Sequence, residues 1–108
     1  MKLYGIKNCD SVKKARVYLD GHNVDYEFID FRDSSIGINT INELIEKVGM
    51  EALVNKRSTT YRGLSDAQKS NITSSLILDN ITLIKRPVVV NGQQVLVGFK
   101  EDAFKALI

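Results

Sequence analysis

The sequence predicts an α/β fold with a mixed sheet, in the order β-α-β, helical insertion, β-β-α. Strand-like apolar segments lie at both ends of the chain, an Asn-Gly pair separates the last two of them, and helical spacing dominates residues 39–80. The 108 residues suit one domain, and a hydrophobic content of 44% is typical of a globular protein. We therefore expect a single domain over residues 1–108.

The first element is a strand over residues 2–6, followed by a polar turn and a helix. Asp10 and Ser11 are suitable N-caps for this helix, Asn8 is an alternative, and Gly21 ends it. The apolar positions that recur at helical spacing are Val12, Ala15 and Leu19. Residues 24–31 then alternate as a strand, so this unit implies two parallel strands with a right-handed crossover.

The insertion is predicted over about residues 39–80, after a polar loop. Thr40 and Glu43 fit a capping box, and Gly49 ends the helix that follows them. Its apolar stripe consists of Ile41, Leu44, Ile45 and Val48. Residues 51–55 suggest a short helix, and Ser65–Gln68 is a second capping box that precedes a helical stretch to about Leu78.

Residues 83–90 and 94–97 are strand-like, and Asn91-Gly92 between them is a strong hairpin signal. The apolar residues Phe99, Ala103, Phe104 and Leu107 predict a last helix against the core. A parallel pair and an antiparallel hairpin can share one sheet with helices on its faces. This order is that of a thioredoxin-like fold that carries an insertion.

Charge and composition exclude several function classes. The net charge of +2 is too small to indicate nucleic-acid binding, and no apolar run approaches the roughly 20 residues of a membrane span. The first residues are too short and interrupted for a signal peptide, so we expect a cytoplasmic location. A single cysteine allows no intramolecular disulfide and no zinc site built on several thiolates, so no metal is expected.

Cys9 is the main candidate for chemistry. A lone thiol is ordinarily an inert buried residue, but Cys9 lies between the first strand and the first helix, where open α/β sheets bind ligands. The helix N-terminus, together with Lys7 and Lys13, favours the nucleophilic thiolate, whereas Asp10 opposes it. The alternative is that Cys9 merely fills the turn.

Position 12 would hold the second thiol of a two-cysteine redox motif, and Val12 occupies it. An oxidised Cys9 would therefore need an outside thiol, such as glutathione or another protein. His22, the one histidine, follows Gly21 and suits a helix end better than a general base.

Three segments together resemble the arsenate reductase (ArsC)/Spx/MgsR family, most closely its YffB-like subgroup. They are Leu3–Asp10 with Lys13–Arg16, Asn55–Arg62, and Ile84–Val90. Gly98-Phe99 also matches the segment after the hairpin. The resemblance spans essentially the whole chain and implies the same thioredoxin-like fold with a helical insertion.

The resemblance implies that Cys9 is the nucleophile, that Arg86 precedes a cis-proline, Pro87, and that Arg57 is a binding arginine in a polar loop. Asn8, Lys13, Arg57 and Arg86 are then the expected residues for binding substrate or glutathione. Guanidinium groups suit this task because they can hold carboxylates and oxyanions with paired hydrogen bonds. Arsenate reductases of the family have a third arginine where this chain has Gly98, and an insert arginine near Asn55.

The predicted function is that of a monothiol oxidoreductase of the arsenate reductase family, with glutathione as co-substrate and no permanent cofactor. A small anionic substrate and glutaredoxin are the other expected partners. The alternatives are a true arsenate reductase, an Spx-like regulator that binds RNA polymerase, and a family member whose thiol is inactive.

Overall fold

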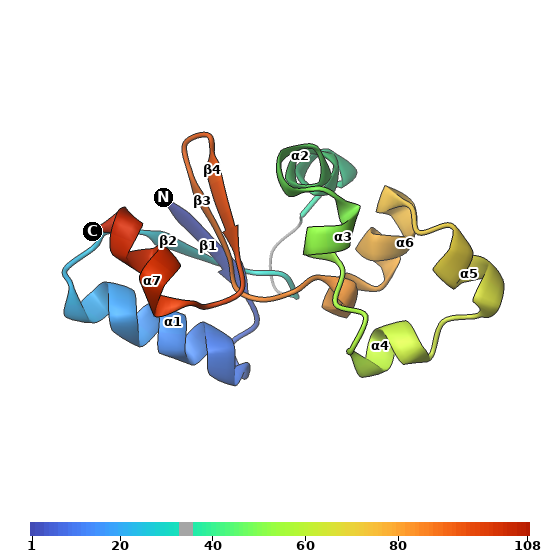
Figure 1. Cartoon of the computed structure of the whole chain (residues 1–108), viewed down its shortest axis with the longest axis horizontal. Coiled ribbons are helices and arrows are strands. Elements are labelled where there is room, and N and C mark those ends of the chain that lie inside the picture. Colours follow the sequence, from blue (N-terminus) through green and yellow to red (C-terminus); the bar gives the residue numbers. More distant parts are fainter. Residues whose placement is uncertain (33–35) are drawn as a thin grey trace. The chain divides into compact units, whose positions relative to one another are not determined.

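A computed structural model of the chain describes residues 1–32 and 36–108. The chain divides into two compact units, Met1–Ser34 with Arg86–Ile108, and Ser35–Lys85 (Figure 1). Each unit is described by itself. The second unit corresponds closely to the helical insertion predicted over residues 39–80.

The first unit contains a four-stranded mixed sheet in the order β2-β1-β3-β4. Its strands are β1 (Lys2–Gly5), β2 (Glu27–Asp30), β3 (Val88–Asn91) and β4 (Gln94–Val97). β1 pairs in parallel with β2 and antiparallel with β3, and β3 pairs antiparallel with β4. The predicted mixed thioredoxin-like sheet is confirmed.

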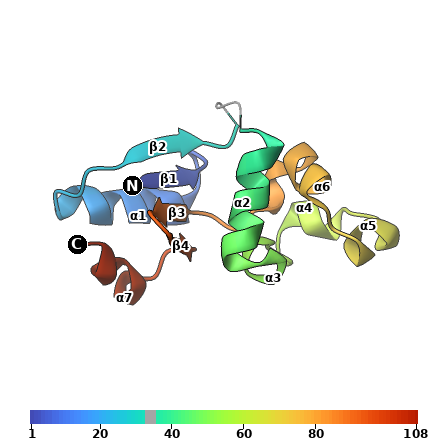
Figure 2. The same cartoon turned by 90° about the horizontal axis from the view of Figure 1, so that it is seen from above.

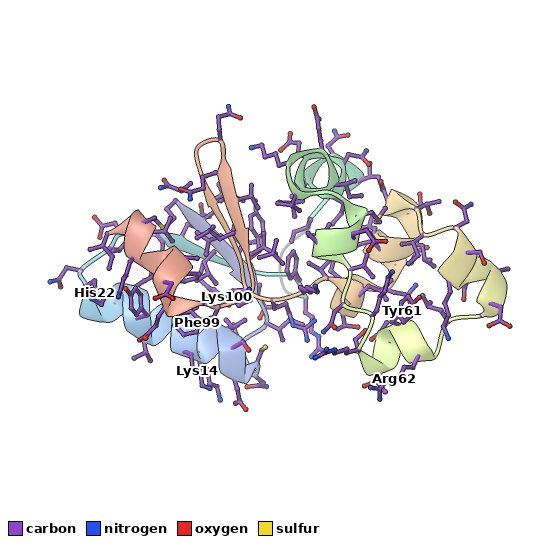
Figure 3. The ribbon with its side chains drawn as sticks, viewed as in Figure 1. Lys14, His22, Tyr61, Arg62, Phe99 and Lys100 are labelled. Atoms are coloured by element: carbon purple, nitrogen blue, oxygen red, sulfur yellow. The ribbon has the colours of Figure 1, made fainter. Side chains whose placement is uncertain are left out.

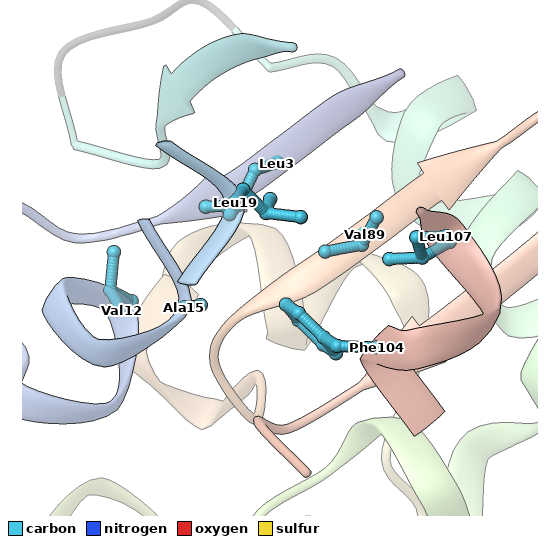
Figure 4. Packing of buried hydrophobic residues seen from close by; sticks show 7 residues of the cluster. All are labelled: Leu3, Val12, Ala15, Leu19, Val89, Phe104 and Leu107. Carbon is cyan, nitrogen blue, oxygen red and sulfur yellow. The ribbon is translucent and has the colours of Figure 1, made fainter. Parts of the chain in front are cut away.

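Helix α1 (Asp10–Gly21) and helix α7 (Glu101–Phe104), which continues as a 3₁₀ turn (Lys105–Leu107), cover one face of this sheet. Leu3 and Val89 are cross-strand partners, so their side chains lie on the same face. They pack against apolar residues of both helices and the 3₁₀ turn (Figure 4), and these are Val12, Ala15, Leu19, Phe104 and Leu107. This cluster holds α1 against the central strand β1.

Several boundaries in this unit differ from the sequence prediction. Cys9, rather than Asp10 or Ser11, is the N-cap of α1. The predicted strand over 83–90 is shorter, because a 3₁₀ turn occupies Ile81–Leu83 and β3 begins at Val88. The hairpin turn consists of Gly92 and Gln93, since Asn91 still pairs with Gln94 and Gly92 supplies the positive φ of 63°.

The second unit is built from short helices. They are α2 (Ile38–Val48), α3 (Met50–Leu53), α4 (Thr59–Arg62), α5 (Asp66–Ser70) and α6 (Ser74–Asp79). Figure 2 shows α2 beside α6, and Ser74 donates a hydrogen bond to Asn42 between them. An antiparallel bridge pairs Val54, directly after α3, with Ile84 near the end of the unit.

The predicted capping box at Ser65 and Gln68 is confirmed, and Gly49 ends α2 at a φ of 84°. The box predicted at Thr40 and Glu43 is wrong. α2 begins at Ile38 with Gly37 as its N-cap, because the apolar stripe extends one turn back to Ile38. Part of the loop predicted before this helix, residues 33–35, lies outside the described residues.

Two further corrections concern the rest of the insertion. The helical stretch predicted through Leu78 is two helices, α5 and α6, because Thr73 caps a new helix by accepting a hydrogen bond from the N–H of Leu76. The polar loop predicted around Arg57 ends at Ser58, where a short helix, α4, begins, and this N-cap serine accepts from the N–H of Tyr61. Serine and threonine N-caps thus start three of the unit's short helices.

Gly5 permits the close packing of β1 against α1, and replacing it should destabilise the fold. A Cβ at position 5 would lie 2.6 Å from Cγ2 and 2.9 Å from Cγ1 of the buried Val12. We expect Gly5→Ala to lower the free energy of unfolding by about 1–3 kcal/mol, as overpacking does in other cores. Urea denaturation followed by circular dichroism measures this.

Gly21→Ala is the matched control, since a Cβ there meets nothing within 4 Å. It should leave the stability unchanged or raise it by about 0.5–1 kcal/mol, because alanine favours helix more than glycine does. Equal stability of the two variants would contradict the packing described for Gly5.

Candidate functional site

Cys9 lies in the first unit, where the loop after β1 enters α1. Its backbone is extended, with φ −100° and ψ 125°, as an N-cap residue requires. Its N–H donates to the carbonyl of Ile6 at 3.2 Å, and its carbonyl accepts from the N–H of Lys13 at 3.0 Å. These two bonds hold the residue at the end of the helix and leave the half-buried thiol beside the first turn.

The surroundings of the sulfur favour its charged form. Burial by itself raises the pKa of the Cys9 thiol and is the largest single influence. It is outweighed by the N–H of Val12, by the hydrogen bond and positive charge of Arg86, and by the N–H of Ser11, so the pKa is lowered. An N-cap side chain normally accepts hydrogen bonds from these backbone positions. In this protein the sulfur of Cys9 occupies the position of the capping oxygen, but it forms no hydrogen bond of standard geometry to a backbone N–H of α1.

Arg86 reaches the thiol from the segment that enters β3. The Arg86–Pro87 peptide bond is cis, which confirms the prediction for Pro87. Pro87 is buried, and its carbonyl accepts from the N–H of Gly98 at 2.8 Å. The end of the β3–β4 hairpin therefore anchors the residue next to Arg86, so that a rigid element directs the guanidinium toward Cys9.

A buried carboxylate supports the loop that precedes the thiol. Asp30, at the end of β2, is only 6% exposed. One of its oxygens accepts from the N–H of Lys7 at 3.0 Å, and the other accepts from the N–H of Arg32 at 2.8 Å. The sequence reasoning missed Asp30. Since the carboxyl ends of parallel strands share one edge of a sheet, the signal available in the sequence was the place of Asp30 near the end of the strand predicted over residues 24–31.

The other predicted site residues are placed as follows. Asn8 is exposed in the turn before Cys9, and Lys13 is exposed one turn into α1. Arg57 belongs to the second unit, where its N–H donates to the side-chain oxygen of Asn55 at 3.0 Å. The convergence of Arg57 with Cys9 and Arg86 stays a prediction, because Arg57 belongs to a different unit from the other two residues.

The two remaining expectations concern His22 and metal ions. His22 is the C-cap of α1, as expected for a helix end, and its ring nitrogen Nδ1 lies 2.8 Å from the carbonyl oxygen of Tyr18 (Figure 3). Within residues 1–32 and 36–108, no three His, Cys, Asp or Glu side chains gather to hold a metal ion. No helix in the same ranges is long and apolar enough to cross a membrane.

This arrangement can present a thiolate to an electrophilic atom. The thiolate is the nucleophilic form of cysteine, and here a helix N-terminus and one guanidinium stabilise it. Arg86 can also hold a carboxylate or an oxyanion that arrives next to the sulfur. Thiol–disulfide exchange and attack on a small oxyanion are both within the reach of these groups.

The alkylation rate of Cys9 should report the lowered pKa. Only the thiolate reacts, so the rate rises with pH and levels off above the pKa. We expect the midpoint to lie below that of a free cysteine, and Arg86→Gln to move it to higher pH because a positive charge is lost. Iodoacetamide kinetics between pH 5 and 10 measure both midpoints.

Arg16→Gln serves as the control, because it removes the same charge from α1, the helix that Cys9 caps. Arg16 lies over the ring of Phe28, 4.1 Å from its centroid, and donates to the Tyr26 hydroxyl rather than to the thiol. It should leave the midpoint unchanged. A midpoint for the wild type at or above that of a free cysteine would show that Cys9 is not activated.

Comparisons with the sequences of two other proteins extend these observations. An uncharacterized protein of Haemophilus influenzae is 39% identical, over 96% of this chain and 95% of its own length. The global transcriptional regulator Spx of Staphylococcus saprophyticus is 26% identical, over 98% of this chain and 85% of its own.

Solved structures agree with the fold. The YffB protein superposes with a TM-score of 0.90 and 40% identity, covering 97% of this chain and 96% of that one. An arsenate reductase (ArsC) related protein of Brucella melitensis gives a TM-score of 0.78 and 36% identity, covering 97% and 91%. A glutaredoxin of Archaeoglobus fulgidus, 19% identical with a TM-score of 0.56, shares the fold over 98% of this chain and 82% of its own. Residues 4–107 match the ArsC family, so the chain belongs to that family.

Proposed function

We propose that the protein is a monothiol oxidoreductase that uses glutathione to reduce disulfides, with Cys9 as the nucleophile. The observation that supports this most is the position of Cys9, at the N-terminus of α1 and beside Arg86, in a chain with no second cysteine. Such a thiol is activated and has no partner within its own chain. Glutathione, an abundant thiol in reducing compartments such as the cytoplasm, would supply the missing sulfur.

The first step is exchange with a mixed disulfide between a substrate thiol and glutathione. The Cys9 thiolate attacks the glutathione sulfur, a Cys9–glutathione bond forms, and the substrate sulfur leaves as a thiolate that takes up a proton. The positive charge of Arg86 and the N–H groups of Val12 and Ser11 keep Cys9 ionised for this attack. The same groups make Cys9 a good leaving group later, because a lower pKa speeds departure.

The second step restores the enzyme. The thiolate of another glutathione attacks the glutathione sulfur of the adduct, oxidised glutathione forms, and Cys9 leaves as a thiolate. The disulfide bond has thus moved from the substrate to glutathione: the substrate sulfur ends as a thiol, the sulfur of the second glutathione is oxidised in its place, and one oxidised glutathione is released. Val12, at the position of a second thiol in two-cysteine motifs, is 1% exposed and packs in the core. A resolving thiol from outside the chain is therefore needed.

Glutathione carries two carboxylates, which cationic side chains would bind. We assign this task to Arg86, Arg57 and Lys13, with Asn8 as a hydrogen-bonding residue in the turn. A hydrogen bond to a charged group contributes about 1.5–3 kcal/mol. Arg57→Gln should therefore weaken glutathione binding by roughly tenfold to a hundredfold.

Arsenate reduction is a second candidate, supported by the similarity to an arsenate reductase related protein. A tetrahedral oxyanion needs several donors around one centre. Gly98 stands at the expected place of one arginine, where the backbone has a positive φ of 82° and carries no side chain. Lysines could supply charge, but not the forked geometry of a guanidinium.

A regulatory role is the third candidate, supported by the similarity to Spx. An Spx-like regulator would act by docking on RNA polymerase rather than by turnover. A pull-down with the C-terminal domain of the polymerase α-subunit distinguishes a regulator from an enzyme. Stable retention that does not need Cys9 would favour the regulator over the enzyme.

The main experiment compares two reactions of the same protein. Incubation with oxidised glutathione should give a Cys9–glutathione adduct by mass spectrometry, and reduced glutathione should remove it. Incubation with arsenate, glutathione and glutaredoxin should give little arsenite. Cys9→Ser should abolish adduct formation completely, since no other thiol is present.

Rapid arsenite production that Cys9→Ser abolishes would assign the protein to the arsenate reductases instead. A protein that forms no adduct and produces no arsenite would contradict both enzymatic candidates. That result would support the remaining alternative, a member of the ArsC family whose thiol is inactive.

A further inference from the structure

A groove in the first unit begins one helical turn from Cys9. It has a volume of about 420 Å³ and is lined by Lys13, Lys14, Val17, Tyr18, Phe99 and Glu101. Four of these residues form one face of α1, since positions 13 and 17 and positions 14 and 18 are one turn apart. Phe99 and Glu101 come from the segment that enters α7, and Figure 3 labels Lys14 and Phe99 on the two sides.

The floor of the groove is apolar, and it is built rigidly. The rings of Tyr18 and Phe99 lie 5.9 Å apart, and both pack against the buried Phe104, at 6.0 Å and 4.9 Å. Val17 is 71% exposed. In the described part of the chain, the large hydrophobic side chains exposed to this degree are Val17 and, at the C-terminus, Ile108. Val17 thus adds an exposed apolar group to the lining that it shares with the rings of Tyr18 and Phe99.

The charges on the groove are unequal. Two exposed lysines, Lys13 and Lys14, line the groove together with one glutamate, Glu101, and the exposed Lys100 and Asp102 lie on either side of Glu101 in the chain. The excess of positive charge favours an acidic occupant. The combination of an apolar floor and lysines calls for a ligand that has both an apolar side chain and a carboxylate.

The distance to Cys9 suits a polypeptide. With a rise of about 1.5 Å per helical residue, Val17 lies about 12 Å along α1 from Cys9, and Lys13 lies about 6 Å along it. An extended peptide spans roughly 3.3 Å per residue. A chain whose cysteine is bonded to the glutathione sulfur that Cys9 attacks would therefore place its residues two to four positions away over the groove. Glutathione itself has only one residue on each side of its cysteine.

We propose that this groove binds the substrate polypeptide, by an apolar side chain and an acidic side chain two to four residues from the target cysteine. The proposal rests on the proposed function, because it assumes that Cys9 exchanges with a glutathione disulfide on that cysteine. Glutathione held by Lys13 would reach only the end of the groove next to Cys9 and would leave the part lined by Val17 and Phe99 open, so this part selects among protein substrates. The chemistry at Cys9 is the one described above.

The test uses synthetic peptides whose single cysteine is in a disulfide with glutathione. One peptide carries a leucine and an aspartate within four residues of the cysteine, a second carries serine and glycine there, and a third carries leucine and lysine. The wild type should reduce the first at least about tenfold faster, in kcat/KM, than the second, which is the size of effect that one apolar group produces in a pocket. The third should fall between them.

Two groove variants should remove this preference and leave the reduction of a small disulfide unchanged. Val17→Ser removes the exposed apolar group, and Lys14→Glu reverses one charge on the rim. Lys105→Glu makes the same charge change at an exposed site outside the groove and should keep the preference. Equal rates on all peptides by the wild type, or an unchanged preference in Val17→Ser and Lys14→Glu, would overturn the proposal.

A binding measurement separates this proposal from the proposed function. Fluorescence anisotropy of the first peptide with its cysteine replaced by serine, against the Cys9→Ser protein, should show binding that Val17→Ser weakens severalfold. No binding would overturn the groove proposal even if glutathione-dependent turnover were found. Binding without any turnover would support the groove and contradict the oxidoreductase. Concentration-dependent dimerisation that Val17→Ser abolishes, without peptide binding, would show that the groove serves a second copy of the chain.

Discussion

The close approach of strand β1 to helix α1 determines where the thiol lies. Gly5 has no Cβ, and the branched side chain of Val12 fills the space that a Cβ would take. This contact brings the first turn of α1 against the end of β1, so the connection between them can be only four residues long. Cys9 is the last residue of that connection and therefore becomes the N-cap.

The electrostatics of the thiol follow from that position. At an N-cap, a side chain faces the backbone N–H groups of the first turn, and a sulfur there gains from their partial positive charge. Arg86 adds a full charge from the segment before β3, and Asp30 holds the loop by accepting from the N–H of Lys7. Residues at or next to the ends of β1, β2 and β3 thus activate Cys9, which is the single thiol of the chain.

The sequence predicted the elements better than their ends. The mixed sheet, the cis bond at Pro87 and the Ser65 capping box came from strong local patterns or from the family resemblance, and the structure confirms them. The N-cap of α1 was misassigned because cysteine is a poor capping residue by propensity, so Asp10 and Ser11 took precedence. The packing of Gly5 against Val12 decides instead at which residue α1 begins. A contact between two separate elements cannot be recognised from the local sequence.

The candidate site shows the same division. Cys9 could be found from its place between a strand and a helix, and Arg86 from the motif around the proline. Asp30 and the groove beside Val17 depend on how β2 and α7 meet the rest of the unit, which no local pattern encodes. Val17, an exposed apolar residue of α1, lines this groove.

The central claim is that one thiol suffices because glutathione resolves the adduct. The direct measurement is a single turnover, in which the purified Cys9–glutathione adduct is mixed with reduced glutathione and followed by mass spectrometry. We expect the adduct to decay to the free thiol at a rate proportional to the glutathione concentration, with one oxidised glutathione released per protein. An adduct that persists at high concentrations of glutathione would contradict the mechanism, because Cys9 would then be modified but not turned over.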